Sequence, residues 1–384
     1  MGSGTLTGAG LYIHVPFCAS VCPYCDFAVT IAGAERRQAY LDGIAREAAA
    51  AAWVGPAFDT VYLGGGTPSS LSAGQLATLL DELRRSLPVG DDAAVFLEIN
   101  PEDVTREAVA EWVELGVSFA SLGVQSFDDE ALAWLGRRHS ADAARAAIEN
   151  LRDGGVETVS IDLIYGLEGQ TAVAWQRQLA EAAARAVNHL SCYQLTIHDG
   201  TVFGRRHAAG ELAEAPEPRQ AELFLRTHTV LADLGYEGYE VSNFAAAPRH
   251  RSRHNSKYWS HAPYLGLGPS AHSFDGRRRW WNHRKLRIWQ HAVEQGHQPV
   301  EGSEQLTSVE LAFEAVMLGL RTAAGVDLSD VAAQHGIDIL KPNRGTIERL
   351  RDSGHLVVDG STVRPTLAGM AIADAIARSL EVGQ

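Results

Sequence analysis

The feature that most constrains the fold of this chain is a repeated alternation of short β-rich segments with longer segments of helical periodicity. The β-rich segments cover Leu11–Val15, Thr60–Leu63, Val95–Ile99, Val117–Val124, Thr158–Ile164 and His189–Thr196, and the helical segments cover Glu35–Trp53, Ser72–Ser86, Thr105–Leu115, Ala141–Asp153 and Thr171–Val187. Apolar strands that alternate with helices predict a parallel sheet with right-handed crossovers. Six units, fewer than the eight of a closed barrel, favour an α/β fold with a partial (β/α)6 TIM-like barrel. Its site is expected at the carboxyl ends of the strands.

Four parts are expected along the chain. Residues 1–10 are rich in Gly and Thr and indicate a tag or a disordered start, residues 11–235 form the barrel, and residues 236–300 cap it and contact a ligand. Residues 301–384 are predicted to form a smaller winged-helix-like domain, with helices Ser308–Arg321, Asp327–His335 and Asn343–Asp352, a hairpin Gly354–Arg364 and a helix from Leu367. The third helix has mixed charge and no basic stripe, so we expect an interaction or lid domain without nucleic-acid binding.

Composition narrows the class of protein. The chain has 384 residues and a formal net charge of −14, which disfavours general affinity for nucleic acid or anionic membranes. No apolar run reaches the ~20 residues of a membrane span, so a cytoplasmic location is expected. One local exception is a basic and aromatic stretch, Arg277–Arg287 with Trp280, Trp281 and Trp289. Such a stretch suits a phosphate backbone with stacked bases, a flat dianion such as a porphyrin, or simply a solvated amphipathic helix.

Three of the four cysteines, Cys18, Cys22 and Cys25, lie in one C-x3-C-x2-C segment after the first β-rich segment. Three thiolates on one loop hold three irons of a [4Fe–4S] cluster and leave the fourth open to a small molecule. A structural zinc site needs four ligands, and only His14 and Asp26 lie nearby. An odd number of clustered thiols without a signal peptide also argues against a disulfide framework. Cys192 stands alone in an apolar segment and is expected to be a small buried side chain.

Other chemistry-bearing residues follow the later β-rich segments. The run Gly64–Gly66 with Thr67 lets a backbone approach a ligand closely and is expected to leave its N–H and C=O groups free. Glu98 ends the third segment, where a carboxylate could receive ribose hydroxyls, or where Asn100 and Pro101 simply start a helix. Asp162 lies within an apolar segment and needs a partner, because an unpaired buried carboxylate is costly.

The cysteine spacing resembles that of the radical S-adenosylmethionine (SAM) superfamily. Nine motifs in order resemble the coproporphyrinogen III dehydrogenase (HemN) family, and most closely its HemW branch of haem chaperones: HVPFC, GGGTPS, GVQSF, LGRRHS, IDLIYGL, YQLTI, YEVSNFA, RHNSKYW and YLGLGPSAHSF. The similarity covers roughly residues 11–380. It implies a cluster at the three cysteines and, around SAM, Tyr12, Gly65, Gly66, Thr67, Glu98, Gln125, Arg137 and Asp162, with Tyr24 beside the cluster loop.

Two features favour the chaperone branch. Phe27 stands where the true dehydrogenase has a further cysteine, and the H-N-x-x-Y-W segment of the chaperone is present here. The resemblance therefore implies haem contact by His254, Tyr258 and Trp259, with His254 as the iron ligand, and His250, His261 and His272 follow as candidates. A histidine hydrogen-bonded within a loop is the other interpretation of His254.

The chain departs from the family pattern at three places. Glu168 replaces a common proline, and Ser252 replaces a common cysteine, so a thiolate from that position is unavailable for haem. The Trp280–Trp289 stretch matches the family less well than the rest.

The expected function is that of a chaperone that carries a [4Fe–4S] cluster, binds SAM, and delivers haem to acceptor haemoproteins. Two alternatives stay open at this point. One is an oxygen-independent coproporphyrinogen III dehydrogenase, in which a 5′-deoxyadenosyl radical removes hydrogen from a propionate, and the other is a radical SAM methyltransferase. The expected partners are haem, haem acceptors and an electron donor such as a flavodoxin or ferredoxin. Weak contact with a membrane surface is also an expectation.

Overall fold

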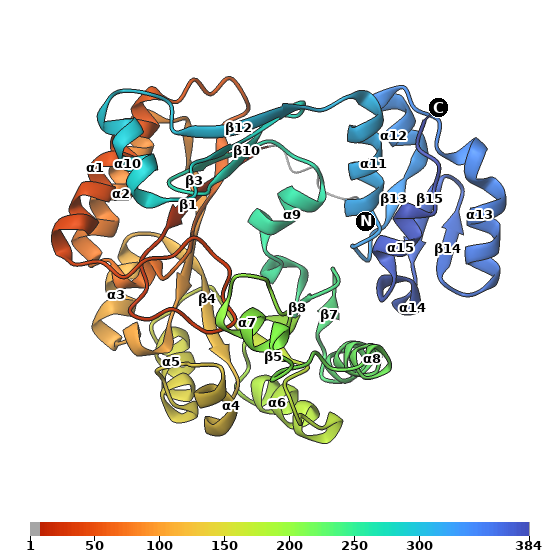
Figure 1. The fold of residues 1–384 in the computed structure, drawn as a ribbon, viewed down its shortest axis with the longest axis horizontal. Coiled ribbons are helices and arrows are strands. Elements are labelled where there is room, and N and C mark those ends of the chain that lie inside the picture. The colour runs from red at the N-terminus through yellow and green to blue at the C-terminus, as the bar shows by residue number, and fades with distance from the viewer. Residues whose placement is uncertain (1–7, 384) are drawn as a thin grey trace.

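The computed structural model describes residues 8–383 and is built around one twelve-stranded sheet (Figure 1). The strands are ordered β12-β11-β10-β9-β1-β2-β3-β4-β5-β6-β8-β7. Strands β1 to β6 pair in parallel with their neighbours in the chain, which confirms the predicted partial barrel. Their bounds are Ala9–Val15, Phe58–Gly65, Val89–Ile99, Val117–Gln125, Thr158–Tyr165 and His189–Gln194.

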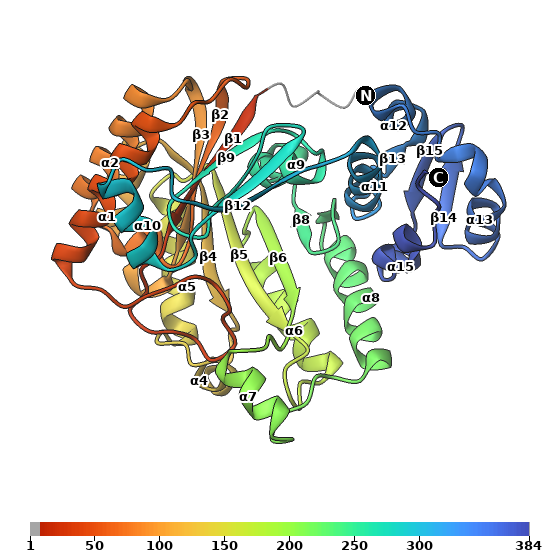
Figure 2. The ribbon, with the colours of Figure 1, turned by 45° about the horizontal axis from the view of Figure 1, so that its top comes forward.

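Helices cover the outer face of the six parallel strands (Figure 2). They are α1 (Ala34–Ala50), α2 (Ala73–Ser86), α3 (Arg106–Glu114), α4 (Asp129–Trp134), α5 (Ala141–Asp153) and α6 (Ala172–Ala184), and α7 (Val202–Ala208) and α8 (Glu217–Asp233) follow β6. Ser72, Thr105, Ser140 and Thr171 each cap the following helix by accepting a hydrogen bond from a backbone N–H of its first turn. Such caps satisfy donors that a helix start leaves unpaired, so these residues fix where the helices begin.

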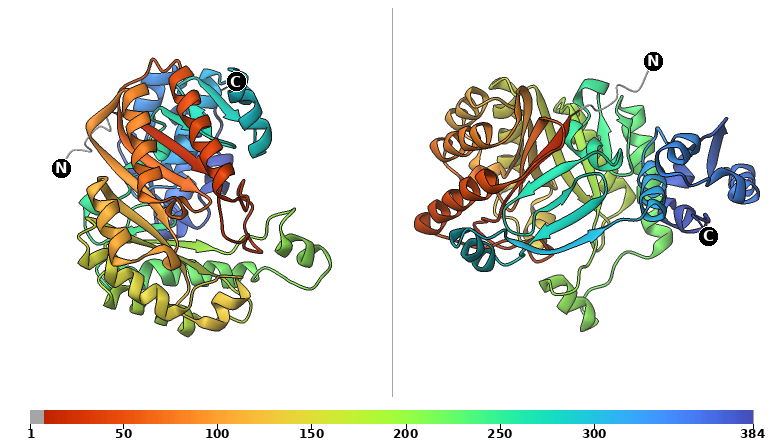
Figure 3. Two further views of the ribbon diagram at one scale, coloured as in Figure 1. Left: turned by 90° about the vertical axis from the view of Figure 1, so that its left-hand side faces the viewer. Right: turned by 90° about the horizontal axis from the view of Figure 1, so that it is seen from above.

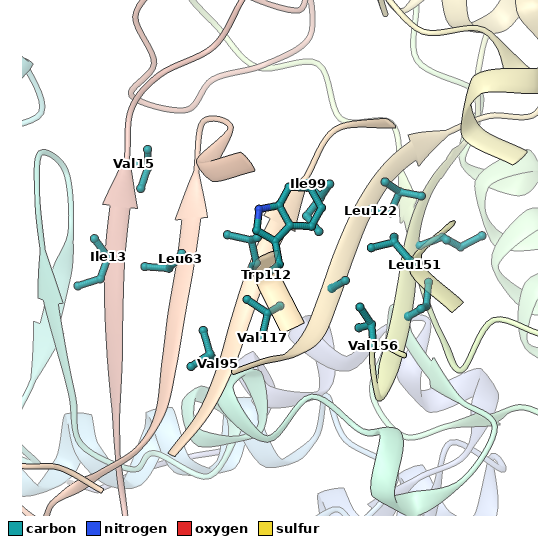
Figure 4. Packing of buried hydrophobic residues seen from close by; sticks show 14 of the residues in the cluster. Ile13, Val15, Leu63, Val95, Ile99, Trp112, Val117, Leu122, Leu151 and Val156 are labelled. Atoms are coloured by element: carbon teal, nitrogen blue, oxygen red, sulfur yellow. The ribbon is translucent and has the colours of Figure 1, made fainter. Parts of the chain in front are cut away.

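The core lies between the strands and the helices that cover them (Figure 4). Ile13, Leu63, Val95 and Leu122 point from the strands into this layer, and Trp112 reaches it from α3. Each is almost fully buried. Because each such side chain contributes about 1.5–3 kcal/mol when it leaves water, this layer fixes the positions of the strand ends above it.

Residues 236–305, which include the segment 236–300 expected to cap the barrel, contain six short strands that extend the sheet at both edges. On one edge, β8 (Asn243–Ala245) and β7 (Glu237–Gly238) continue antiparallel from β6; on the other, β9 (Tyr264–Leu267) pairs in parallel with β1, and β10 (His272–Phe274), β11 (Arg278–Asn282) and β12 (Val300–Gln305) continue antiparallel. Helix α9 (Arg253–Trp259) packs against β1 and β2, and α10 (Leu286–Glu294) packs beside α1.

The C-terminal part forms a separate lobe beside the barrel (Figure 3). It contains α11 (Ser308–Gly319), α12 (Leu328–His335), α13 (Leu340–Asp352), α14 (Leu367–Met370) and α15 (Ala373–Arg378), and a small sheet of β13 (Val326–Asp327), β15 (Thr362–Pro365) and β14 (Leu356–Asp359). Three helices and an antiparallel hairpin give the winged-helix-like arrangement expected from the sequence. This lobe has its own hydrophobic core.

A tag or disordered start is expected at residues 1–10, and residues 1–7 of this segment lie outside the described residues. From Ala9 onward the chain is already in β1, so the expectation is wrong for that part. Across residues 8–383, no helix combines the length and the apolar character needed to cross a membrane.

Candidate functional site

A cavity of about 430 Å³ opens at the carboxyl ends of the parallel strands. Its volume is within the range of small-molecule sites. All three clustered cysteines line it, and so do eight of the nine residues expected around SAM: Tyr24, Gly65, Gly66, Thr67, Glu98, Gln125, Arg137 and Asp162. The topology of the sheet thus gathers at one place residues that are spread over about 150 positions of the sequence.

The cysteine loop is held against the end of the sheet by its own backbone. Phe17 pairs with Thr30 in an isolated β-bridge, and the N–H of Cys18 donates to the carbonyl of Thr30. Cys18, Cys22 and Cys25 are all partly buried, and burial raises the pKa of the Cys25 thiol to about 11. A thiol must lose its proton to bind a metal, so metal binding at this loop releases protons.

Two donors reach the sulfur atoms of this loop. The hydroxyl of Thr67 lies 3.5 Å from Cys18 Sγ, and Nη1 of Arg137 lies 3.6 Å from Cys22 Sγ. Hydrogen bonds and positive charge stabilise thiolates and tune the potential of a cluster they bind. Three thiols on a loop with two such donors therefore fit a [4Fe–4S] cluster with one open iron. When bound, such a cluster supplies single electrons to a ligand on that iron.

The glycine run has a role that the sequence did not indicate. Gly65 has a φ of +107°, and a Cβ there would lie 2.5 Å from the His14 ring, while a Cβ on Gly66 would lie 2.8 Å from the Val15 carbonyl oxygen. The N–H groups of Gly66 and Thr67 donate to the carbonyls of Val15 and Phe17, at 2.8 and 2.7 Å. The expectation that the N–H groups remain free is thus wrong. Only glycine can approach so closely, and the run locks the start of the cysteine loop to β2.

Two partly buried carboxylates form the floor of the cavity. Glu98 accepts hydrogen bonds from the Gly65 N–H and the Tyr62 hydroxyl, both at 2.9 Å, and burial raises its pKa. Ser121 donates to Asp162 at 3.3 Å, and burial together with the charge of Glu98 raises the pKa of Asp162 to about 7. Ser121 is thus the partner that the partly buried Asp162 required. Two carboxylates at the bottom of a cavity favour a cationic ligand.

Asn100 lines the cavity, whereas its place in the sequence indicated only the start of a helix. Its side-chain amide donates to the hydroxyl of Thr67 at 3.0 Å, and its amide oxygen accepts from Nη2 of Arg137 at 2.6 Å. Asn100 therefore links the two side chains that contact the cysteine sulfurs. Its position two residues after Glu98, on the same side of an extended chain, was the available signal.

Gln125 and Tyr12 take different places relative to the cavity. Gln125 lines it and has a φ of +64°, a conformation that costs a non-glycine residue free energy and that is common at functional sites. Tyr12 does not line the cavity, and its hydroxyl oxygen lies 3.1 Å from Nδ1 of His14. A direct contact of Tyr12 with a ligand in the cavity is therefore not part of this arrangement.

His254 belongs to α9 and lies against the amino ends of β1 and β2, at the other end of the barrel from the cavity. Its Nδ1 lies 2.9 Å from the Thr60 hydroxyl and its Nε2 lies 2.9 Å from the Tyr258 hydroxyl. His254 is 1% exposed. Burial, and to a smaller extent the positive charge of Lys257, lower the pKa of its imidazole to about 3. Neither ring nitrogen is available to an iron in this conformation, in contrast to the expected haem ligand. Coordination at His254 requires α9 to move.

The other expected haem contacts and candidate histidines are scattered. Tyr258 packs edge-on against Tyr264, and Trp259 packs against Tyr239. His250 is buried with its Nδ1 2.8 Å from the Thr158 hydroxyl, and His261 lies 2.9 Å from Glu314 Oε2. His272 is exposed beside Trp281. Cys192 is buried in β6, as expected.

The fold and the cavity define a class of protein. In this class a partial parallel barrel carries a cysteine loop and two carboxylates that line the same cavity. Comparison with known proteins agrees with this class. Residues 12–182 match the family model "Radical SAM superfamily", and residues 306–372 match "HemN C-terminal domain". Coproporphyrinogen III oxidase (HemN) from Escherichia coli has a similar structure, with a TM-score of 0.82 at 24% identity over 97% of this chain and 89% of that chain. That likeness bears on the fold alone.

Curated relatives narrow the family. A protein of Mycobacterium tuberculosis named "Heme chaperone HemW" is 36% identical over 97% of this chain and 94% of its own length. A protein of the same name from Synechocystis is 36% identical over 85% of this chain and 81% of its own length. The chain therefore belongs to the radical SAM superfamily, in the HemW branch of the HemN family. A [4Fe–4S] cluster and SAM are the cofactors that this superfamily implies.

Proposed function

We propose that this protein is a haem chaperone that binds haem and delivers it to acceptor haemoproteins. The relatives that are 36% identical over most of the chain are named for this activity, which is the observation that carries the proposal. The cavity adds support for the cofactors, because it places three thiols, their hydrogen-bond donors and two carboxylates together.

In this proposal Cys18, Cys22 and Cys25 hold the cluster, and SAM occupies the cavity beside it. Glu98 and Asp162 neutralise the positive charge of the ligand, Arg137 is oriented by Asn100, and Tyr24, Gly65, Gly66, Thr67 and Gln125 complete the walls. A reducible cluster needs an electron donor such as a flavodoxin or ferredoxin. Weak contact with a membrane surface remains a prediction from the sequence.

Haem contact by His254, Tyr258 and Trp259 belongs to the proposal only if α9 rearranges, because His254 is enclosed by Thr60 and Tyr258. The His254→Ala variant tests this point. A changed Soret band supports a rearranged α9, and an unchanged Soret band and stoichiometry show that another residue binds the iron.

The function itself is tested by transfer of haem. The protein is loaded with one equivalent of haem and mixed with an apo-haemoprotein whose holo spectrum differs from that of the donor. Transfer that is faster than from serum albumin, measured by stopped-flow absorbance, supports the chaperone function. Absence of haem binding, or release no faster than from albumin, contradicts it.

A further inference from the structure

The loop that carries the three cysteines presents apolar side chains to solvent. Phe27 and Ile31 are each 62% exposed, and Val21 is 52% exposed. Val21 and Phe27 also line the cysteine-lined cavity. Large apolar side chains that are exposed together on one segment are typical of interaction sites, whereas single ones are normal on any surface. A partner that binds this loop therefore lies beside the cysteine sulfurs.

Basic residues stand next to this apolar surface. Residues 276–293 contain six Arg and Lys residues and no Asp or Glu, in a chain whose net charge is −14. This segment reaches the cysteine loop through Arg284, whose Nη2 donates to the carbonyl of Asp26. Lys285 and Arg287 follow at the start of α10, which lies beside α1 and close to the loop that follows β1 (Figure 2). All three of these cations are exposed.

The stability of α10 does not account for these cations. The N-terminus of a helix carries a partial positive charge, so Arg and Lys are unfavourable there and acidic residues are favourable. The first turn of α10 has no acidic residue, and no side chain caps it. Within residues 8–383, Arg284, Lys285 and Arg287 form no ion pair. A helix start that breaks a local rule without compensation inside the chain indicates a contact with another molecule.

The carboxylates nearby do not cancel this positive charge. Asp26 faces His198, with its Oδ2 3.7 Å from the imidazole Nδ1. Glu35, in the first turn of α1, is followed by the exposed Arg36. The three cations at the start of α10 are therefore in excess. The exposed apolar and basic residues together form a surface that we call the cluster-loop face: Val21, Phe27, Ile31, Arg284, Lys285, Arg287 and Ile288.

We propose that the cluster-loop face docks an acidic electron-transfer protein, which reduces the [4Fe–4S] cluster held by the cysteine loop. The reduced carrier gives up one electron and the cluster takes up that electron. This inference rests on the proposed function for its cluster, and it deepens that function by naming where the electron donor binds. Transient redox complexes have small interfaces, and opposite charges speed their association. A few cations around a small apolar centre suit such a complex.

An anionic membrane is the other occupant that a basic and apolar face could bind, and it is disfavoured. Each basic side chain adds only modestly to attraction by anionic lipid, and the face has three in a chain whose net charge is −14. The same numbers disfavour nucleic acid, whose binding depends on many phosphate contacts. The position of the face on the cysteine loop, in contrast, brings a redox partner close to the cluster.

The test uses the full-length protein with its reconstituted cluster, and an acidic flavodoxin and an acidic ferredoxin as probes. Calorimetric titration with the oxidised carriers measures binding without any electron transfer. Anaerobic stopped-flow absorbance then measures how fast the reduced carriers reduce the cluster. Photoreduced deazariboflavin, a small uncharged reductant that needs no docking surface, is the reference for each variant.

The variants change the charge and the apolar centre of the face separately. Lys285→Glu with Arg287→Glu reverses charge, and Phe27→Ala and Ile31→Ala remove apolar surface. Arg284 is left in place because it holds the cysteine loop.

Matched controls change the same kinds of residue outside the face. Arg277→Glu with Arg278→Glu makes the same change in net charge at the opposite end of β11. Val54→Ala removes an apolar side chain that is 96% exposed and lies beyond the end of α1. Unchanged cluster absorbance and an unchanged rate with deazariboflavin show that a variant has kept its cluster.

Charge reversal should lower the rate of reduction by the carriers about tenfold or more at low ionic strength. The difference from the parent should shrink as salt is added, because salt screens exposed charges. Phe27→Ala and Ile31→Ala should raise the dissociation constant severalfold and leave its dependence on salt unchanged. Both controls should behave as the parent protein.

The docking proposal and the function on which it rests fail in distinguishable ways. If the face variants keep the affinities and rates of the parent, or if the parent accepts electrons from neither carrier, the docking proposal is overturned, while haem transfer by the parent still supports the chaperone function. Cosedimentation with phosphatidylglycerol vesicles tests the other occupant: binding that only the face variants lose, with unchanged reduction by the carriers, overturns the proposal in favour of a membrane. A parent that is reduced through this face and transfers no haem refutes the chaperone function alone.

Discussion

Nδ1 of His254 lies 2.9 Å from the hydroxyl oxygen of Thr60, inside the barrel at the amino ends of β1 and β2. His189 is similarly placed, between the hydroxyls of Ser160 and Tyr239 at 2.7 and 2.8 Å. Each imidazole hydrogen-bonds to hydroxyl groups in the buried core. Burial lowers the pKa of each to about 3, so both rings are neutral at pH 7.

These two histidines should make the protein sensitive to acid. The unfolded chain protonates them near pH 6.5 and the folded chain only near pH 3, so their contribution to the free energy of unfolding falls as the pH drops below 6.5. At pH 5.5 each histidine lowers the free energy of unfolding by on the order of 1 kcal/mol. Urea unfolding of the parent and of His254→Gln at pH 7.5, 6.5 and 5.5 measures the effect of His254.

The difference between parent and variant is the quantity to compare, because Glu47 and Asp162 act in the opposite direction. Burial raises the pKa of each to about 7, so the folded state takes up their protons as the pH falls. The stability of the parent relative to His254→Gln should decrease from pH 7.5 to pH 5.5, and His291→Gln, at an exposed position, should show no such change. An unchanged difference for His254→Gln would show that His254 is not held neutral.

Replacing Cys18, Cys22 or Cys25 with Ala should abolish the broad visible absorption of the reconstituted cluster. Each thiolate is expected to hold one iron, and the cavity offers no spare cysteine, because Cys192 is buried in β6. Cys192→Ala serves as the control and should retain the absorption. A full cluster in Cys22→Ala would refute the three-cysteine assignment.

SAM affinity should rise with pH through about 7, where Asp162 becomes ionised and attracts the cationic ligand. Equilibrium dialysis of the cluster-bearing protein should give a dissociation constant several-fold lower at pH 8 than at pH 6. Asp162→Asn should weaken binding at pH 8 and remove the dependence on pH. Tyr12→Phe is the matched control, since Tyr12 does not line the cavity, and weakened binding in this variant would contradict the placement of SAM.

Coproporphyrinogen III should not be converted to protoporphyrinogen IX above background, even with reduced cluster and SAM. Phe27 lines the mouth of the cavity with 62% of its surface exposed, where the dehydrogenase resemblance calls for a further cysteine. Anaerobic incubation followed by mass analysis of the porphyrins is the measurement. Robust decarboxylation would favour the dehydrogenase over the chaperone.

The sequence predicted the barrel strands and the cavity residues well, because apolar runs and residues at strand ends are local signals. It placed the start of β3 at Val95, whereas the strand begins at Val89, since Asp91 and Asp92 in its exposed first half are typical of a loop. The short strands β7 to β12 were missed because their pairing depends on β1 and β6, which lie far away in the chain.

The enclosure of His254 by Thr60 and Tyr258 could not be predicted from the sequence for a similar reason. Its partner Thr60 precedes it by almost two hundred residues, and no local pattern shows which side chain will enclose an imidazole. The free N–H groups expected at Gly66 and Thr67 were also a matter of tertiary contact, because their acceptors belong to the segment that leads into the cysteine loop.

The pairing of β1 with β9 has a consequence for synthesis of the chain. Gly10 pairs with Tyr264, so one edge of β1 has no partner until roughly 250 further residues have been made. At 5–20 residues per second, this takes about 13–50 s on the ribosome. During that time the nascent barrel carries an open apolar strand edge beside the cysteine loop, where another chain could add a strand. Closure of this edge is therefore a late event in the synthesis and folding of the chain.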